Sequence, residues 1–127
     1  MNYSIEQEEK YSVYRLKEEK LISSIAPDLK SLFTVESSKG IKSMVLDLEE
    51  VQYCDSSGLS AILVGNRSCR DNGGTFVISG MQDGVRKVIQ ISQLDKVLHI
   101  TPTVNEAVDL IFMEEVEREL GTEDETL

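Results

Sequence analysis

The chain has 127 residues, 40% of them hydrophobic, a length and composition that suit one domain with a single core. Its formal net charge is -10, and no cluster of lysine and arginine is interleaved with aromatic residues, so we expect no direct binding of DNA or RNA. No stretch reaches the roughly 20 apolar residues of a membrane-spanning helix, and the first residues lack a secretory signal, so we expect a cytoplasmic protein that does not insert into a membrane.

The first forty residues predict a β-hairpin followed by a helix. Residues Tyr3–Ile5 and Tyr11–Leu16 are rich in aromatic and branched side chains, and a polar stretch separates them. Ala26–Asp28 places a proline where the first turn of a helix tolerates it, and Gly40 lies beyond the expected helix end.

Strands and helices alternate from Met44 onward. Met44–Leu48 is an apolar run broken only by Asp47, as is typical of a central strand. This order implies parallel strands joined by right-handed crossovers, so the sequence predicts an α/β fold with one mixed sheet and flanking helices. The further elements expected are a helix at Leu59–Arg70, a strand at Thr75–Ser79, a helix that includes Val85, Val88 and Ile89, and a strand at Val97–Ile100.

The last predicted helix leads into an acidic tail. Thr103–Glu106 fits a capping box, in which the first and last side chains bind free amides at a helix start. We place the domain at residues 1–113 and the tail at residues 114–127, which contain seven acidic residues and one basic residue and so carry -6 of the net charge. The composition favours a solvated, frayed helix end over a partner-binding segment, and we assign the tail no function.

The segment most informative about function is Val51–Leu59, which joins a buried strand to a helix start, where open α/β sheets tend to place their sites. Asp55 and Ser56 are both good helix caps, and Gly58 keeps the backbone accessible. Local chemistry alone therefore favours a capping role. The functional alternative is a serine hydroxyl that a kinase can reach, where a phosphate would meet the positive end of the helix dipole.

Four stretches, in their order along the chain, resemble the pattern of STAS domains, and the resemblance runs from about Tyr3 to Phe112. It implies a mixed sheet flanked by helices and a role in partner switching. In that cycle the unmodified antagonist binds an anti-sigma factor that is also a serine kinase, and phosphorylation releases it. The matching residues are Val45–Leu48, Val51 with Cys54–Leu59, Gly80–Met81 through Val85–Arg86, and Leu94–Val97.

The same resemblance implies Ser57 as the phosphate acceptor, with Ser56 as the fallback. Asp55 beside it would shape the turn and assist the hydroxyl, and Asp55–Leu59 would form the partner-binding segment. The implied partners are the anti-sigma factor with its serine kinase activity and a serine phosphatase. The nucleotide would belong to the kinase, so we expect no cofactor in this chain. One departure is Glu19–Ile22, where many members have Gly-x-Leu-Asp, and this leaves open a subfamily with a different partner.

Enzymatic alternatives lack a catalytic set. The single histidine, His99, lies in a predicted strand, where we expect a packed imidazole rather than a base for Ser57 or Cys54. We expect Cys54 to pack in the core rather than act as a reactive thiol, and the spacing of Cys54, Cys69 and His99 does not suggest a metal site. The sequence thus predicts a protein that is not an enzyme.

A stronger alternative keeps the fold and changes the role. STAS domains also resemble small cytoplasmic subunits of membrane transport complexes, in which the same surface docks to a transporter. The pair Ser56 and Ser57 favours the phosphorylation switch.

Overall fold

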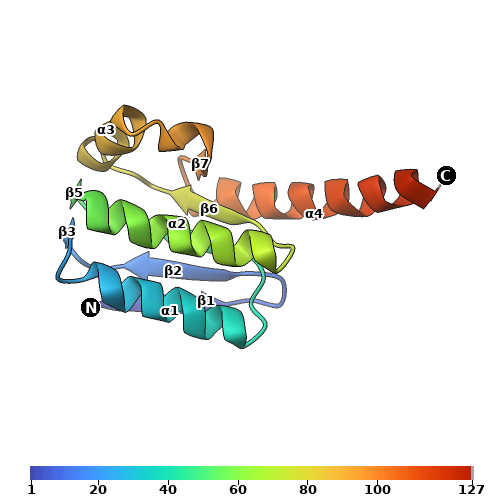
Figure 1. Cartoon of the computed structure of the whole chain (residues 1–127), viewed down its shortest axis with the longest axis horizontal. Coiled ribbons are helices and arrows are strands. Elements are labelled where there is room, and N and C mark those ends of the chain that lie inside the picture. The colour runs from blue at the N-terminus through green and yellow to red at the C-terminus, as the bar shows by residue number, and fades with distance from the viewer. Residues whose placement is uncertain (127) are drawn as a thin grey trace.

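A five-stranded mixed sheet is the centre of the computed structural model, which describes the backbone of residues 1–126 and the side chains of residues 1–121 (Figure 1). The strands lie in the order β1-β2-β4-β6-β7; β1 is antiparallel to β2, and the remaining neighbours are parallel. The predicted α/β fold and its opening hairpin are confirmed. The strands are β1 (Tyr3–Gln7), β2 (Ser12–Leu16), β4 (Met44–Asp47), β6 (Phe76–Ser79) and β7 (His99–Thr101).

The helices divide unequally between the two faces of this sheet (Figure 1). Three of them, with the 3-10 helix Leu94–Lys96, supply the larger hydrophobic core, whereas the fourth covers the opposite face alone. On the larger side are α1 (Ala26–Ser38), α2 (Ser56–Asp71) and α3 (Asp83–Ile91), and on the other is α4 (Val104–Thr126).

Alternation along the strands explains the two cores. Tyr14 of β2 points to the larger core, where Phe33 lies between it and Phe76 in edge-to-face contacts with centroid distances of 5.8 and 5.6 Å. Gly65 of α2 permits this packing, because a Cβ atom there would lie 2.5 Å from the Phe76 ring. The strand residues on the other face pack against α4 and are Val13, Val45 and Val77.

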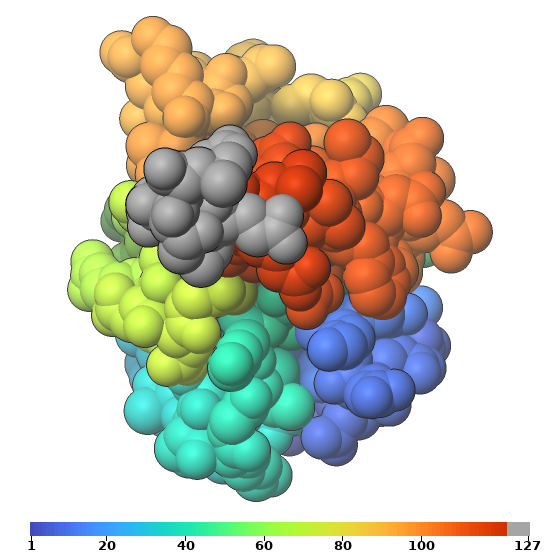
Figure 2. Space-filling model, turned by 90° about the vertical axis from the view of Figure 1, so that its right-hand side faces the viewer, coloured from blue at the N-terminus to red at the C-terminus, as the bar shows by residue number. Residues whose placement is uncertain are grey.

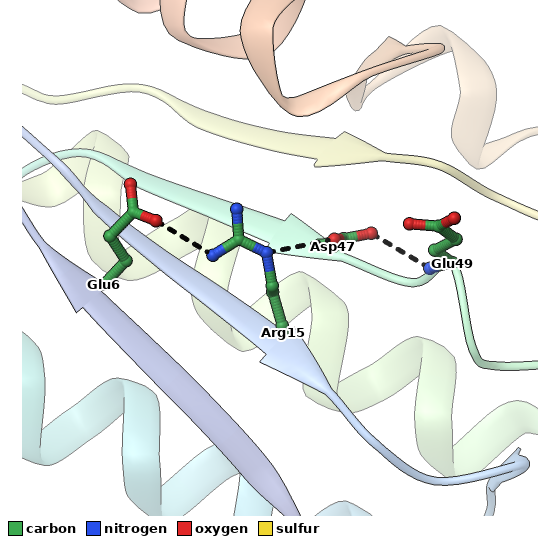
Figure 3. A network of polar contacts seen from close by, with 4 residues as sticks. All are labelled: Glu6, Arg15, Asp47 and Glu49. Atoms are coloured by element: carbon green, nitrogen blue, oxygen red, sulfur yellow. Dashed lines mark hydrogen bonds and ion pairs between the residues drawn. The ribbon is translucent and has the colours of Figure 1, made fainter.

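Asp47, the acidic residue in the otherwise apolar β4, is held by a polar network (Figure 3). It lies on the α4 side of the sheet with a relative exposure of 7%. One carboxylate oxygen accepts the Glu49 N–H at 3.0 Å, and the other lies 3.6 Å from Nε of Arg15. Arg15 also donates to Glu6 at 3.2 Å. The buried carboxylate is therefore paired, as its burial requires.

Several elements differ from the sequence-based expectation, and the last strand, β7, begins at His99 rather than at Val97. The strands β3 (Lys20–Leu21) and β5 (Tyr53–Cys54) form a separate two-stranded parallel sheet that no pattern indicated. Helix α2 begins at Ser56, three residues before the predicted start, because Asp55 caps it. Helix α4 continues through Thr126, and the division between domain and tail after residue 113 stays a prediction.

Candidate functional site

The start of α2 is positioned by the small β3–β5 sheet (Figure 1). Leu21 is fully buried and lies opposite Cys54 in this sheet, and its carbonyl accepts the N–H of Asp55 at 3.2 Å. The segment Glu19–Ile22, where the sequence departs from the STAS pattern, thus lies directly beside the predicted acceptor segment. Its backbone carbonyls accept N–H groups of residues 52, 53 and 55, and the buried Leu21 side chain packs against the start of α2.

Asp55 is the N-cap of α2, and both of its carboxylate oxygens are engaged. Oδ1 accepts the N–H of Gly58 at 2.9 Å, and Oδ2 accepts the N–H of Ser23 at 3.2 Å. The first bond satisfies one of the free amides of the helix start, and the second joins the loop before α1 to the same carboxylate. The capping role expected for Asp55 is confirmed, and the carboxylate fixes two loops at once.

The two candidate acceptors differ in exposure. Ser56 is the first residue of α2 and is exposed, whereas Ser57 is the second residue and is half-buried. Both stand at the amino end of a 16-residue helix, where the backbone dipole favours a negative group. Both hydroxyls thus lie where the helix dipole favours a negative group, beside the Asp55 carboxylate, whose charge disfavours one.

Gly58 is required by the close approach of the β3 backbone. A Cβ atom at this position would lie 2.4 Å from the Leu21 carbonyl oxygen and 2.6 Å from Sγ of Cys54. Leu59, the next residue, is half-buried and packs against the main core. The start of α2 therefore packs closely against β3 and β5, which fix the position of Asp55–Leu59.

Both cysteines are buried. Burial raises the pKa of the Cys54 thiol to about 12, with a smaller contribution from the Asp55 charge. Burial likewise raises the pKa of Cys69 to about 12. A thiolate nucleophile is thus strongly disfavoured at neutral pH, and the packing role expected for Cys54 is confirmed.

Tyr53 is a surface residue beside the site that the sequence analysis did not single out. Its side chain is 48% exposed, although it directly precedes the buried Cys54. On the other side, α3 approaches so closely that a Cβ at Gly84 would lie 2.3 Å from the Gln52 carbonyl oxygen. Alternation in a two-residue strand could have indicated that Tyr53 faces outward, but the strand itself was not recognisable.

The expectation of a packed imidazole at His99 is wrong. The His99 side chain is 45% exposed and lies 3.8 Å from a carboxylate oxygen of Glu114. It belongs to the edge strand β7 and pairs with Val77, so it lies on the α4 face of the sheet, whereas Cys54 and Cys69 pack in the core on the other face.

The described residues include no group of three or more histidine, cysteine or acidic side chains that could hold a metal ion. In the same part of the chain, no helix has the length and apolar character needed to cross a membrane.

This fold, with its capped helix start beside a two-stranded sheet, is that of a STAS domain. The chain matches the STAS domain family over residues 2–107 and belongs to it.

Similar proteins include antagonists of anti-sigma factors. A Thermotoga maritima protein described as a candidate anti-sigma factor antagonist is 32% identical over 81 residues, covering 64% of this chain and 67% of that protein. The crystal structure of a candidate antagonist from Thermotoga maritima has a TM-score of 0.77 at 25% identity and covers 86% of this chain and 93% of its own. The Bacillus cell fate determinant SpoIIAA, solved in its phosphorylated form, has a TM-score of 0.67 at 21% identity, with coverage of 87% and 99%.

Proposed function

We propose that this chain is an anti-sigma-factor antagonist that works as a phosphorylation-controlled partner switch. Unmodified, it binds an anti-sigma factor with serine kinase activity and so regulates transcription indirectly. Phosphorylation of Ser57 releases it, and a serine phosphatase restores it. The observation that carries the proposal is the position of Ser57, half-exposed in the first turn of a helix that Asp55 and Gly58 hold against β3 and β5.

The free protein tolerates the modification. A phosphate adds about -1.5 to -2 charge at pH 7, and an anion near a helix amino terminus is favoured by roughly 0.3–1 kcal/mol. Asp55 opposes this, because its carboxylate already occupies the same helix end. The two contributions have opposite signs, and we expect phosphorylation to leave the fold intact.

The complex does not tolerate it. Tyr53, exposed four residues before Ser57, and the half-buried Leu59, two residues after it, suit a partly apolar contact. A charge buried there without a counter-ion costs several kcal/mol. The difference between the free and bound states is what makes the modification a switch.

The relatives support this role. A sequence relative and a solved structure, both from Thermotoga maritima, are described as candidate anti-sigma factor antagonists, and SpoIIAA, which has this fold, has been solved in a phosphorylated form. The chain itself supplies no catalytic step in this proposal, since the two thiols have raised pKa values and His99 lies on the other face of the sheet. The kinase partner provides ATP and the transfer chemistry.

The test uses the anti-sigma factor with a serine kinase domain encoded in the same genome. We expect the kinase and ATP to label the unaltered chain and Ser56→Ala, but not Ser57→Ala. In calorimetry, Ser57→Asp should bind at least tenfold more weakly than Ser57→Ala, with Ser56→Asp as the matched charge control. Equal affinity of Ser57→Asp and Ser57→Ala, or labelling of Ser57→Ala, would overturn the assignment.

If the kinase does not label Ser57 and Ser57→Asp does not weaken binding, the role as a subunit of a membrane transport complex is favoured. Neighbouring genes distinguish the two roles. A kinase of the anti-sigma type or a serine phosphatase beside the gene supports the switch, and an anion or lipid transporter supports the other role.

A further inference from the structure

The second half of α4 is held in a fixed rotation by polar contacts on its underside. Glu114 lies 3.8 Å from His99, and Glu115 lies 3.7 Å from Lys10. One turn later, Arg118 donates a hydrogen bond to Thr75 at the base of β6. Together with Ile111, which is buried against the sheet, these contacts decide which side of the helix faces outward.

The outward side carries an apolar stripe. Met113, Val116 and Leu120 are spaced at i, i+3 and i+7, so they share one face of the helix, and they are 60%, 53% and 53% exposed. Phe112 borders the stripe; it is 42% exposed, and its ring meets the edge of Tyr11 at 6.1 Å. Figure 2 looks at the end of the molecule from which α4 emerges. The described part of the chain does not cover this stripe.

Acidic residues flank the stripe. Glu117 and Glu119 are exposed on either side of it and Asp109 is exposed at its amino end, whereas Lys10 and Arg118 contact residues on the inner side of the helix. An apolar stripe bordered by negative charges is complementary to an amphipathic helix whose own apolar face is bordered by lysine or arginine.

We propose that the outer face of α4, formed by Phe112, Met113, Val116 and Leu120, docks a basic amphipathic helix of a partner protein. A second copy of this chain does not fit, because Glu117 and Glu119 would face the same charges across the seam. An anionic membrane surface is excluded for the same reason. This surface lies toward the opposite end of the molecule from the start of α2 (Figure 1), so it is separate from the phosphorylation switch and independent of it.

The experiment uses two fluorescein-labelled 18-residue model helices that carry leucine along their apolar face. One carries lysine at the flanking positions, and the other carries glutamate. Fluorescence anisotropy at physiological salt measures their binding to the whole chain. We expect the lysine helix to bind and the glutamate helix to bind at least tenfold more weakly. Replacing Met113, Val116 and Leu120 together with Gln should weaken the lysine helix at least tenfold, and Val35→Gln, on an exposed apolar site of α1, should change it less than twofold.

Circular dichroism checks that the triple variant keeps its helices. Should it unfold, Glu117→Lys alone, an exposed change, must still weaken the lysine helix several-fold. The proposal is overturned if the triple variant binds the lysine helix as tightly as the unaltered chain does. The lysine helix would then be attracted by the negative charge of the chain as a whole and not by this face of α4. It is also overturned if sedimentation shows a dimer that the triple variant abolishes, which would make a second copy the occupant. Binding that Ser57→Asp leaves unchanged supports two separate surfaces.

Discussion

The close packing of Gly58 makes its substitution a direct test of the site's architecture. In Gly58→Ala the new Cβ would lie 2.4 Å from the carbonyl oxygen of Leu21 and 2.6 Å from Sγ of Cys54. This carbonyl is a backbone group, so no change of side-chain rotamer can relieve the clash. Strand β3 must recede by about 1 Å to restore an ordinary contact, and this breaks the hydrogen bond from Asp55 N–H to Leu21, which is already 3.2 Å long.

The magnitude follows from three contributions. Overpacking costs about 1–3 kcal/mol, the lost hydrogen bond costs about 1 kcal/mol, and replacing glycine by alanine in a helix returns up to about 1 kcal/mol. We therefore expect Gly58→Ala to lower the free energy of unfolding by about 1–3 kcal/mol. For a chain of this size the melting temperature should fall by roughly 4–12 °C.

Thermal melting followed by circular dichroism measures the effect, with Gly121→Ala as the matched control. Gly121 also lies in a helix, but a Cβ there meets nothing within 4 Å, so this variant should be as stable as the unaltered chain or slightly more stable. If Gly58→Ala melts at or above the temperature of the unaltered chain, β3 does not press on the helix start as described.

Three further predictions concern charged and ionisable groups. Asp55→Ala removes the cap of α2 and should cost about 1–2 kcal/mol in urea unfolding, whereas Asp55→Asn, which can still cap, should cost less. Arg15→Ala leaves the carboxylate of Asp47 at 7% exposure without its cation and should cost about 1–2 kcal/mol; adding Asp47→Asn should recover part of this, and full additivity of the two changes would contradict the pairing. The pKa of both Cys54 and Cys69 is raised to about 12, so unfolded thiols ionise near their ordinary pKa of 9 while folded ones stay protonated, and the free energy of unfolding should fall from pH 9 to pH 11. Urea titrations at the two pH values should show a smaller fall when both cysteines are replaced by alanine.

Most of the fold could be predicted because its elements have strong periodic patterns. The hairpin, the central strand Met44–Asp47 and the alternating helices all follow from apolar spacing and glycine or proline signals. The hydroxyl half of the capping box at Thr103 is also confirmed, since Oγ1 accepts the Glu106 N–H at 3.2 Å. These features depend on neighbours in the sequence, which a pattern can report.

The β3–β5 sheet could not be predicted, because two-residue strands have no period and pair across more than thirty positions of sequence. The bond from Ser23 N–H to Asp55 and the contact of Gly58 with Leu21 depend on that pairing, so the sequence pattern could not indicate either of them. The exposure of His99 was missed for a related reason. Its predicted strand proved to be the edge of the sheet, and α4 covers too little of that edge to bury the imidazole.

Phosphosite mapping of the protein recovered from the cells that produce it tests the central claim most directly. Mass spectrometry of the peptide that contains Ser56 and Ser57, with fragmentation that separates the two positions, reports where a phosphate resides. The switch predicts a phosphorylated fraction on Ser57 that disappears when the anti-sigma kinase gene is deleted. A phosphate on Ser56 alone, or a Ser57 that stays unmodified under every growth condition while that kinase is active, would contradict the account.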